Sequence, residues 1–306
     1  KFDNVKVIES ERLLRNQKYL YDARIVPTSL CDNKVNLAIS TRDTWSITPA
    51  YDISHNGDET KTRLSMTESN FLGTGKLISL ARASNDQRQE YTLIYRDPNV
   101  GGSHAVNNIE YSENSDGYRH FISYKLPFYS LESKHSYGII YNNEEREDPI
   151  YFQQDKLTDL NHRLNHYKIF SGFSQGYKDE KTIRWRYGLS FIEDKFETTD
   201  INLPLVSLNS RKNIYPWLEF NLLENKYTTL TNVNSIKRTE DINLGRNFIA
   251  SIGYSPESLS NDTSRIIYNI SSSNAYKFDK NLISVNTSLK GYWLPDEKKS
   301  QNVMAK

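Results

Sequence analysis

From residue 44 onward, apolar and polar residues alternate along most of the chain. In residues 44–54 the apolar side chains are Trp45, Ile47, Pro49, Tyr51 and Ile53. The same period of two recurs in residues 122–128, where the even-numbered positions are apolar, and in residues 183–191, where the odd-numbered ones are. Polar clusters such as residues 55–60, 113–117 and 142–148 separate these stretches and are expected to be turns. Because successive side chains of a strand point to opposite faces, the pattern predicts roughly a dozen strands joined as antiparallel hairpins.

The first 43 residues follow a different pattern and predict a small α+β module. Residues 9–17 hold the apolar pair Leu13 and Leu14 among polar residues, which indicates a short helix. Residues 19–26 and 35–41 are typical of two strands around a turn at residues 31–34. We therefore expect a domain boundary after Asp43, with an all-β domain over residues 44–306.

A sheet with one apolar and one polar face fits two architectures. A soluble β-sandwich buries its apolar faces against each other, whereas an outer-membrane barrel turns them towards lipid around a polar lumen. Charges in the middle of polar faces, at Lys125, Arg184 and Arg186, suit a wet lumen. Aromatic residues near strand ends suit an interfacial girdle, and the strands approach the ~9–11 residues that cross a bilayer at a tilt. The pattern favours the barrel and leaves the sandwich open.

Composition narrows the classes of function. Lys and Arg total 39 and Asp and Glu total 38, and the resulting charge of +1 argues against a strongly basic nucleic-acid binder. Mean hydropathy is −0.71, yet 12% of the residues are aromatic, which disfavours a disordered chain. The single cysteine, Cys31, excludes an internal disulfide framework. No apolar run approaches the ~18 residues of a transmembrane helix.

No group of residues predicts catalysis. The sequence has no nucleophile elbow, P-loop or dinucleotide fingerprint. His162 and His166 would share a face on a helix or a strand, but no glutamate stands where a zinc-protease motif needs it. We expect no enzyme activity, no metal site and no cofactor.

Four short segments carry turn-forming residues: ESNFLGTGK (68–76), YRDPNVGGS (95–103), YSENSDGY (111–118) and LPFYSLES (126–133). Glycine tolerates positive φ, and proline presets φ and cannot donate to a ladder, so these residues predict tight turns and strand ends. The residues concerned are Asn70, Gly73, Gly75, Asp97, Pro98, Asn99, Gly117, Pro127 and Phe128.

In order and spacing, these segments resemble the BamA/TamA-like outer-membrane assembly superfamily. ESERLLRNQKYLYDARI (9–25) is likewise similar to the second half of a POTRA domain directly before such a barrel. The resemblance implies the C-terminal part of a POTRA domain over residues 1–43 and a bacterial surface-antigen barrel over residues 44–306. It also implies roughly 12 of an expected 16 strands, because barrels of this kind close with a set strand number. The family's lumenal Arg-Gly motif and an aromatic closing strand are not found, so we expect the sequence to be part of a longer protein.

The resemblance further implies a non-enzymatic role in the bacterial outer membrane, with the POTRA part in the periplasm. Other barrel proteins would be assembled or translocated by strand templating at a weak seam, and residues 44–54 are the expected templating strand. Pro49 weakens this seam because it lacks a backbone donor, and the strand should form the edge of an incompletely closed sheet, with its apolar side chains on the convex side. The expected partners are outer-membrane lipid, an unfolded barrel client or secreted protein, and periplasmic or lipoprotein accessory proteins. The alternatives are a two-partner-type secretion or passenger-display barrel and a soluble β-sandwich for adhesion or carbohydrate binding.

Overall fold

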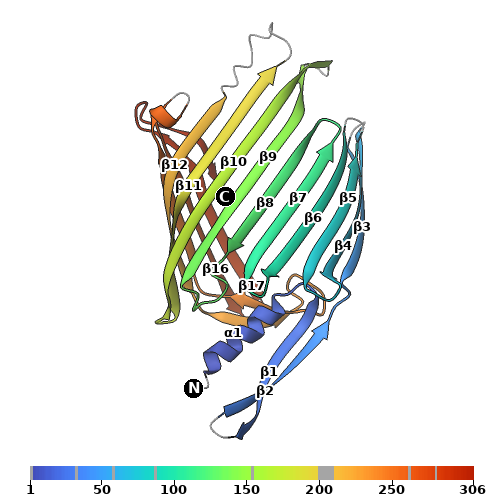
Figure 1. The fold of residues 1–306 in the computed structure, drawn as a ribbon, viewed down its shortest axis with the longest axis vertical. Coiled ribbons are helices and arrows are strands. Elements are labelled where there is room, and N and C mark those ends of the chain that lie inside the picture. The colour runs from blue at the N-terminus through green and yellow to red at the C-terminus, as the bar shows by residue number, and fades with distance from the viewer. Residues whose placement is uncertain are drawn as a thin grey trace.

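The computed structural model describes residues 3–31, 34–56, 59–85, 88–152, 155–198, 210–260, 263–279 and 281–306, and strands dominate it (Figure 1). Its elements are α1 (Asn4–Arg15), β1 (Leu20–Cys31), β2 (Lys34–Asp43), β3 (Ile47–Asn56), β4 (Glu59–Phe71), β5 (Lys76–Ser84), β6 (Gln89–Val100), β7 (Ala105–Asn114), β8 (Gly117–Leu126), β9 (His135–Phe152), β10 (Asp155–Lys178), β11 (Lys181–Thr198), β12 (Arg211–Glu224), β13 (Tyr227–Thr231), β14 (Thr239–Asn243), β15 (Asn247–Ser255), the 3-10 turn η1 (Glu257–Leu259), β16 (Arg265–Phe278), β17 (Asn281–Leu294) and β18 (Lys299–Ala305). None of the helices in these ranges is long and apolar enough to span a bilayer.

α1, β1 and β2 form a small module at one end of the molecule (Figure 1). The Asp3 carboxylate accepts a hydrogen bond of 3.0 Å from the Val5 backbone N–H, which starts the helix earlier than the sequence pattern predicted. β1 and β2 pair as a two-stranded antiparallel sheet, and α1 packs against β1, where Ala23 and Ile25 are buried. The predicted helix and strand pair are thus present. Asp32 and Asn33 of the predicted turn lie outside the described residues.

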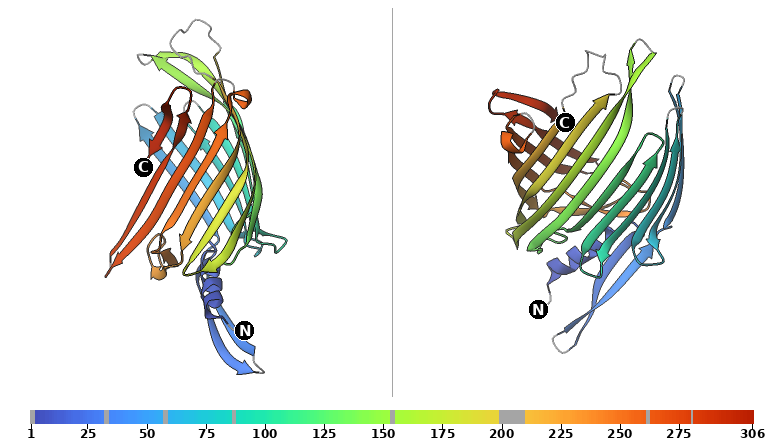
Figure 2. Two further views of the ribbon diagram at one scale, coloured as in Figure 1. Left: turned by 90° about the vertical axis from the view of Figure 1, so that its left-hand side faces the viewer. Right: turned by 45° about the horizontal axis from the view of Figure 1, so that its top comes forward.

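Within the described chain, fourteen strands form one antiparallel sheet in the order β18-β17-β16-β15-β12-β11-β10-β9-β8-β7-β6-β5-β4-β3. The prediction of roughly a dozen strands was therefore slightly low. Each strand pairs with its neighbours along the chain, except that the hairpin β13–β14 stands apart between β12 and β15. The sheet curves around a central space but does not close, and β3 and β18 are its two edges (Figures 1 and 2).

The outward face of this sheet is apolar. Register pairs Tyr51 with Leu64 and Tyr187 with Leu218, and all four side chains are exposed. Corresponding exposed positions on the other strands are Leu80, Leu93, Ile122, Ile139, Tyr167, Ile169, Leu189, Ile252, Ile270 and Leu289. The predicted odd-numbered face of residues 183–191 is confirmed. The other sheets among the described residues are two-stranded hairpins, so no sandwich buries this face.

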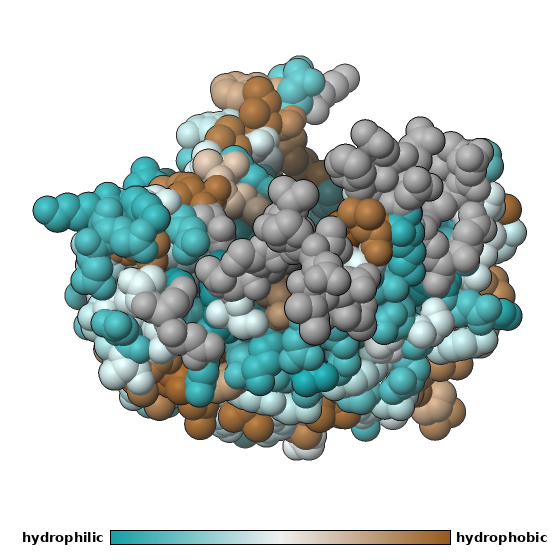
Figure 3. All heavy atoms as spheres, turned by 90° about the horizontal axis from the view of Figure 1, so that it is seen from above, coloured by the Kyte–Doolittle hydropathy of each residue, from teal (hydrophilic) through white to brown (hydrophobic). Residues whose placement is uncertain are grey.

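The inward face is polar. Small polar residues such as Ser123, Thr182 and Ser190 are buried there. Charged residues on the same face pair with one another, as Arg119 Nη1 does with Glu110 Oε1 at 3.0 Å. Seen from above, many hydrophobic residues lie along the lower outer margin of the visible face, and hydrophilic residues gather just above them (Figure 3). The two faces thus separate as the alternation predicted.

β9, β10 and β11 extend well beyond the neighbouring strands (Figure 1). They have 18, 24 and 18 residues, against the ~9–11 that cross a bilayer. Residues 142–148, predicted as a turn, are instead the middle of β9, and the run from Asn142 to Asp148 pairs with β10. Polar cross-strand contacts hold this part together, among them Arg163 Nε to Glu145 Oε2 at 3.1 Å.

Candidate functional site

The free edge of β3 is able to bind a further strand. β3 pairs only with β4 in the described chain. Ser69 donates its backbone N–H to the Ser46 carbonyl oxygen at 2.9 Å, which places this pair in the hydrogen-bonded phase of the ladder. Hydrogen-bonded and non-hydrogen-bonded pairs alternate in an antiparallel ladder. The odd-numbered residues from Ile47 to Ile53 therefore direct their backbone polar groups away from β4, towards the open side.

Pro49 removes one donor from this open side. Pro49 and Met66 are a non-hydrogen-bonded pair, so the backbone groups of Pro49 face away from β4. The ladder between β3 and β4 therefore loses nothing, whereas the free edge offers a carbonyl but no N–H at this position. The structure thus places the missing donor of Pro49 on the edge where the sequence hypothesis needs it.

Two other prolines obey the same rule. Glu147 donates its backbone N–H to the Asp116 carbonyl oxygen, on the β8 side of β9. Pro149, two residues later, faces the same side, where β8 no longer pairs with β9. Pro216 lies just beyond Trp217, where the pairing of β12 with β15 stops. All three prolines occur where no partner strand needs their donor.

The side chains of β3 continue the apolar outer face up to the edge. Ile47, Tyr51 and Ile53 are all exposed, and Leu64 and Met66 lie beside them on β4. They therefore lie on the convex side, as predicted, together with Pro49. Trp45 is 77% exposed but precedes β3, so it belongs to the connection that follows β2 rather than to the strand.

The opposite edge of the sheet is β18. Ser288 and Lys306 exchange two backbone hydrogen bonds of 3.0 Å, which directs the backbone groups of Ala305 away from β17. Neighbouring strands are antiparallel throughout the sheet and their number is even, so β18 runs opposite to β3. Both edges are thus oriented for antiparallel pairing, although no described residue of one pairs with the other.

The turns β4–β5 and β6–β7 share one architecture. The side-chain oxygen of Asn70 accepts from Gly75 N at 2.8 Å, and that of Asn99 accepts from His104 N at 2.8 Å. The Glu68 and Asp97 carboxylates in turn accept from the N–H of these two asparagines. Gly75, Gly102 and His104 adopt positive φ. Two of the turn motifs found in the sequence are therefore copies of a single side-chain-capped turn.

Asn99→Ala should lower the free energy of unfolding by ~1 kcal/mol, because it leaves the His104 N–H without its acceptor. Asn108→Ala is a matched control, since the Asn108 side chain makes no hydrogen bond among the described residues. Urea titration of the folded protein in detergent, followed by heat-modifiable migration on gels, measures both. Equal losses would show that the side-chain cap does not stabilise this turn.

The remaining turn residues fall at strand ends. Gly117 adopts φ 145° in the hairpin β7–β8, where a Cβ would lie 1.9 Å from the Glu145 carbonyl oxygen, so only glycine fits. Pro98 lies within the register shift of β6. Pro127 directly follows the end of β8, as predicted. Phe128 was expected on the outward face, but its ring lies 5.2 Å from the Arg184 guanidinium, on the inner side. The chain leaves β8 before this residue, so the alternation no longer applies to it.

A salt bridge links the N-terminal module to the hairpin β13–β14. We call this hairpin the clasp. Arg15 Nε and Nη2 each donate to a carboxylate oxygen of Asp241 at 2.7 Å. Only 6% of the Arg15 side chain and 9% of the Asp241 side chain are exposed. Burial by itself would lower the pKa of Arg15, but the hydrogen bonds that it donates to the Asp241 and Glu11 carboxylates raise it overall. The guanidinium is therefore held as a buried, fully paired cation.

Further contacts make the clasp and the module one packed unit. Arg238 donates to the backbone oxygens of Arg15 (2.9 Å) and Gln17 (3.2 Å), which places a cation at the C-terminal end of α1. The Arg12 guanidinium lies 4.3 Å from the ring centre of Tyr227. Burial by itself would raise the pKa of Glu240, but backbone donors from Val233 and Asn234 lower it.

The module also contacts the connection between β8 and β9. Glu9 Oε1 accepts from Leu131 N at 2.6 Å, and both residues are buried. Thr182 at the start of β11 donates to the Leu131 carbonyl oxygen at 3.3 Å. Sequence reasoning missed the clasp and these contacts entirely, because their partners lie far apart in the chain and no motif links them.

One histidine of the pair in β10 lies beside a carboxylate. His162 and His166 share the inner face, and His162 Nε2 lies 2.6 Å from Asp194 Oδ1 and stacks on Phe196. No cluster of three metal-ligating side chains occurs among the residues that the structure describes.

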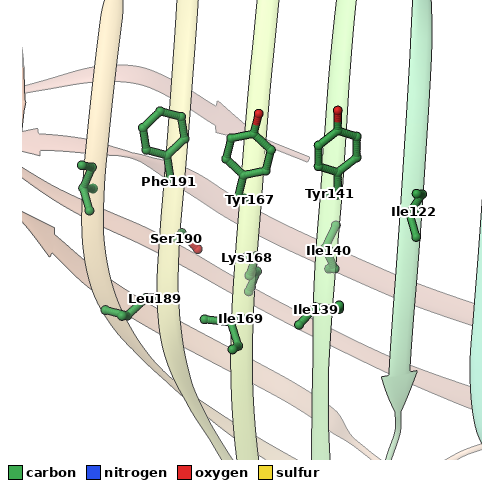
Figure 4. A pocket seen from close by; sticks show the side chains of 11 residues that line it. Ile122, Ile139, Ile140, Tyr141, Tyr167, Lys168, Ile169, Leu189, Ser190 and Phe191 are labelled. Carbon is green, nitrogen blue, oxygen red and sulfur yellow. The ribbon is translucent and has the colours of Figure 1, made fainter.

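A shallow apolar depression of about 540 Å³ marks the outer surface across β8 to β12. Figure 4 shows the rings of Tyr141, Tyr167 and Phe191 above Ile139, Ile169 and Leu189. The outward side chains that line the depression are all apolar or aromatic. The depression is thus a feature of the apolar outer face.

Comparison with known proteins finds structural similarity only. No family model and no curated protein matches the chain. Among solved structures it is similar to BamA from Haemophilus ducreyi lacking POTRA domains 1-3, with 12% identity and a TM-score of 0.41 over 96% of this chain and 50% of that one. It is also similar to CdiB from Acinetobacter baumannii, with 12% identity and a TM-score of 0.43 over 92% of this chain and 46% of that one. The chain spans about half the length of these solved chains.

Proposed function

We propose that this chain is the membrane part of a bacterial outer-membrane protein that assembles or translocates other proteins by strand pairing at an open barrel edge. The observation that carries the proposal is the free edge of β3, flanked by an apolar face that no other part of the described chain covers. The proposed function is non-enzymatic and needs no cofactor.

The bilayer supplies the driving force for pairing. An unpaired backbone polar group costs several kcal/mol in hydrocarbon, where no water can satisfy it. Residues 47, 51 and 53 of β3 each offer an N–H and a carbonyl to the open side, and Pro49 offers a carbonyl only. An incoming strand would satisfy these groups, and it would place its own apolar residues next to Tyr51 and Ile53, facing lipid.

The orientation follows from the two ends of the sheet. The module α1–β2 and the clasp lie at one end, which we assign to the periplasm, where accessory proteins would reach them. The overhanging, polar parts of β9, β10 and β11 lie at the other end, which we assign to the cell exterior.

Site-specific photocrosslinking in the full-length protein tests the proposal. A photoreactive residue at Ile53, on the free edge, should capture a barrel client during its assembly. The same residue at Ile139, equally apolar and outward but on the central strand β9, is the control. Equal capture at both positions would contradict edge pairing. Capture of a secreted polypeptide in place of a barrel client would favour the secretion alternative.

Pro49→Ala should strengthen pairing at the edge. The substitution restores one N–H on the open side and leaves the ladder to β4 unchanged, so pairing should gain ~1 kcal/mol, or roughly a fivefold longer-lived contact. Persistence of the Ile53 crosslink in a pulse-chase experiment measures it. Pro149→Ala, which adds a donor far from β3, should leave that persistence unchanged.

A further inference from the structure

Lysine and arginine residues gather on one part of the inner face without matching carboxylates. Lys125 stands on β8, Lys168 on β10, and Arg186 on β11. Arg186 Nε donates to Glu219 Oε1 at 2.7 Å, and this is the one ion pair that the three make among the described residues. The Lys125 and Lys168 ammonium groups have no carboxylate within 4.0 Å in that part of the chain. Neither ammonium group therefore has an ion-pair partner there.

This excess is local. Farther along the inner face, Arg119 pairs with Glu110 and Glu144, and Arg146 pairs with Glu144 and Asp148. The chain as a whole is nearly neutral, at +1. The two lysines therefore contrast with this paired stretch of the inner face.

Aromatic rings form the wall beside these cations. The Lys168 Nζ atom lies 3.8 Å from the ring centre of Trp217, and Trp217 lies 6.3 Å from Phe170 between ring centres. Gly188 lies between Phe170 and Trp217 in the register, and a Cβ there would lie 2.9 Å from the Phe170 Cβ atom and 2.9 Å from the Cζ2 atom of the Trp217 ring. Glycine thus lets both rings lie close against the sheet, where they are buried. We call Lys125, Lys168, Phe170, Arg186 and Trp217 the cationic patch.

We propose that the cationic patch binds an acidic stretch of polypeptide within the lumen. Ammonium groups form strong, charge-assisted hydrogen bonds with carboxylates. One strand, β9, separates Lys125 from Lys168, which sets the backbones that carry them roughly 10 Å apart at the usual strand spacing. Two carboxylates of an extended chain fit this separation better than one compact anion. The proposal rests on the proposed function, because a membrane barrel is what gives the polypeptide a lumen to enter.

Peptide binding to the purified full-length protein in detergent tests this proposal. The probe is a fluorescent decapeptide of Asp and Ser, and its Lys-Ser analogue and inorganic phosphate are compared with it. The lumenal double variant Lys125→Gln, Lys168→Gln removes the two positive charges that have no ion-pair partner. The matched control, Lys178→Gln, Lys181→Gln, removes two exposed lysines that face each other at the β10–β11 turn.

The acidic peptide should bind, more weakly as salt rises, and the lumenal double variant should weaken binding about tenfold or more, while the control variant should not. Equal binding of the basic peptide, or unchanged binding by the lumenal variant, would overturn the proposal. Displacement of the peptide by phosphate at equal charge concentration would instead identify a small-anion site and overturn the polypeptide assignment. Heat-modifiable migration confirms that both variants are folded. Photocrosslinking at Ile53 reports on edge pairing separately, so the failure of one proposal is distinguishable from the failure of the other.

Discussion

Ile252→Arg is expected to reduce the stability of the membrane-inserted protein by ~2–4 kcal/mol, the cost of an arginine at the middle of the lipid face of a barrel. Ile252 is exposed on the outward face of β15, between Leu218 and Tyr268 of the neighbouring strands. An arginine side chain there has no inward route and no carboxylate beside it in the register. Reversible urea unfolding in lipid vesicles measures the change.

Ser251→Arg is the matched control for that experiment. Ser251 is the preceding residue of β15, so its side chain points inward, and Glu219 stands directly opposite it in the register. A charge in the lumen costs little. Equal losses at positions 251 and 252 would contradict the membrane assignment of the outer face. Gly188, which the alternation also places inward, cannot serve as this control, because a Cβ there would lie 2.1 Å from the Ile169 carbonyl oxygen.

Asp241→Ala is expected to release the N-terminal module from the clasp. It leaves the buried guanidinium of Arg15 without its bidentate partner, and breaking one side of a buried pair typically costs ~3–5 kcal/mol. Hydrogen exchange should accelerate in α1, and limited proteolysis should cut after the helix, while the exchange of the central strands β9 and β10 stays slow.

The double variant Arg15→Met, Asp241→Leu is the control for this prediction. It removes both charges together and keeps apolar volume at both positions, so the module should stay docked. If Asp241→Ala left the exchange of α1 unchanged, the salt bridge would not be what holds the module, and Arg238 and the Arg12–Tyr227 contact would be the next candidates.

The sequence correctly predicted which side chains point outward wherever apolar and polar residues alternate along a strand. In residues 183–191 and 44–54 the alternation separated outward from inward side chains, because one face of each strand has apolar surroundings and the other has polar surroundings. It failed in residues 142–148, where β9 overhangs the apolar band and both faces are polar. Phe128 was misplaced for a related reason: the strand ends at Leu126, and beyond it the chain turns inward to contact Arg184.

The sequence by itself determined the class of the fold, the sidedness of its strands and the positions of its tight turns, because alternation, glycine and proline act over a few residues. The family resemblance also predicted that residues 44–54 form an edge. Only the tertiary structure decided that β18 is the other edge, and on which side of β3 the missing donor of Pro49 falls, because both depend on pairing between strands. The tertiary structure alone also showed that Arg15 pairs with Asp241 of the clasp, and that Lys125 and Lys168 have no ion-pair partner among the described residues. These features join residues far apart in the chain, and long-range contacts of this kind leave no local pattern to find.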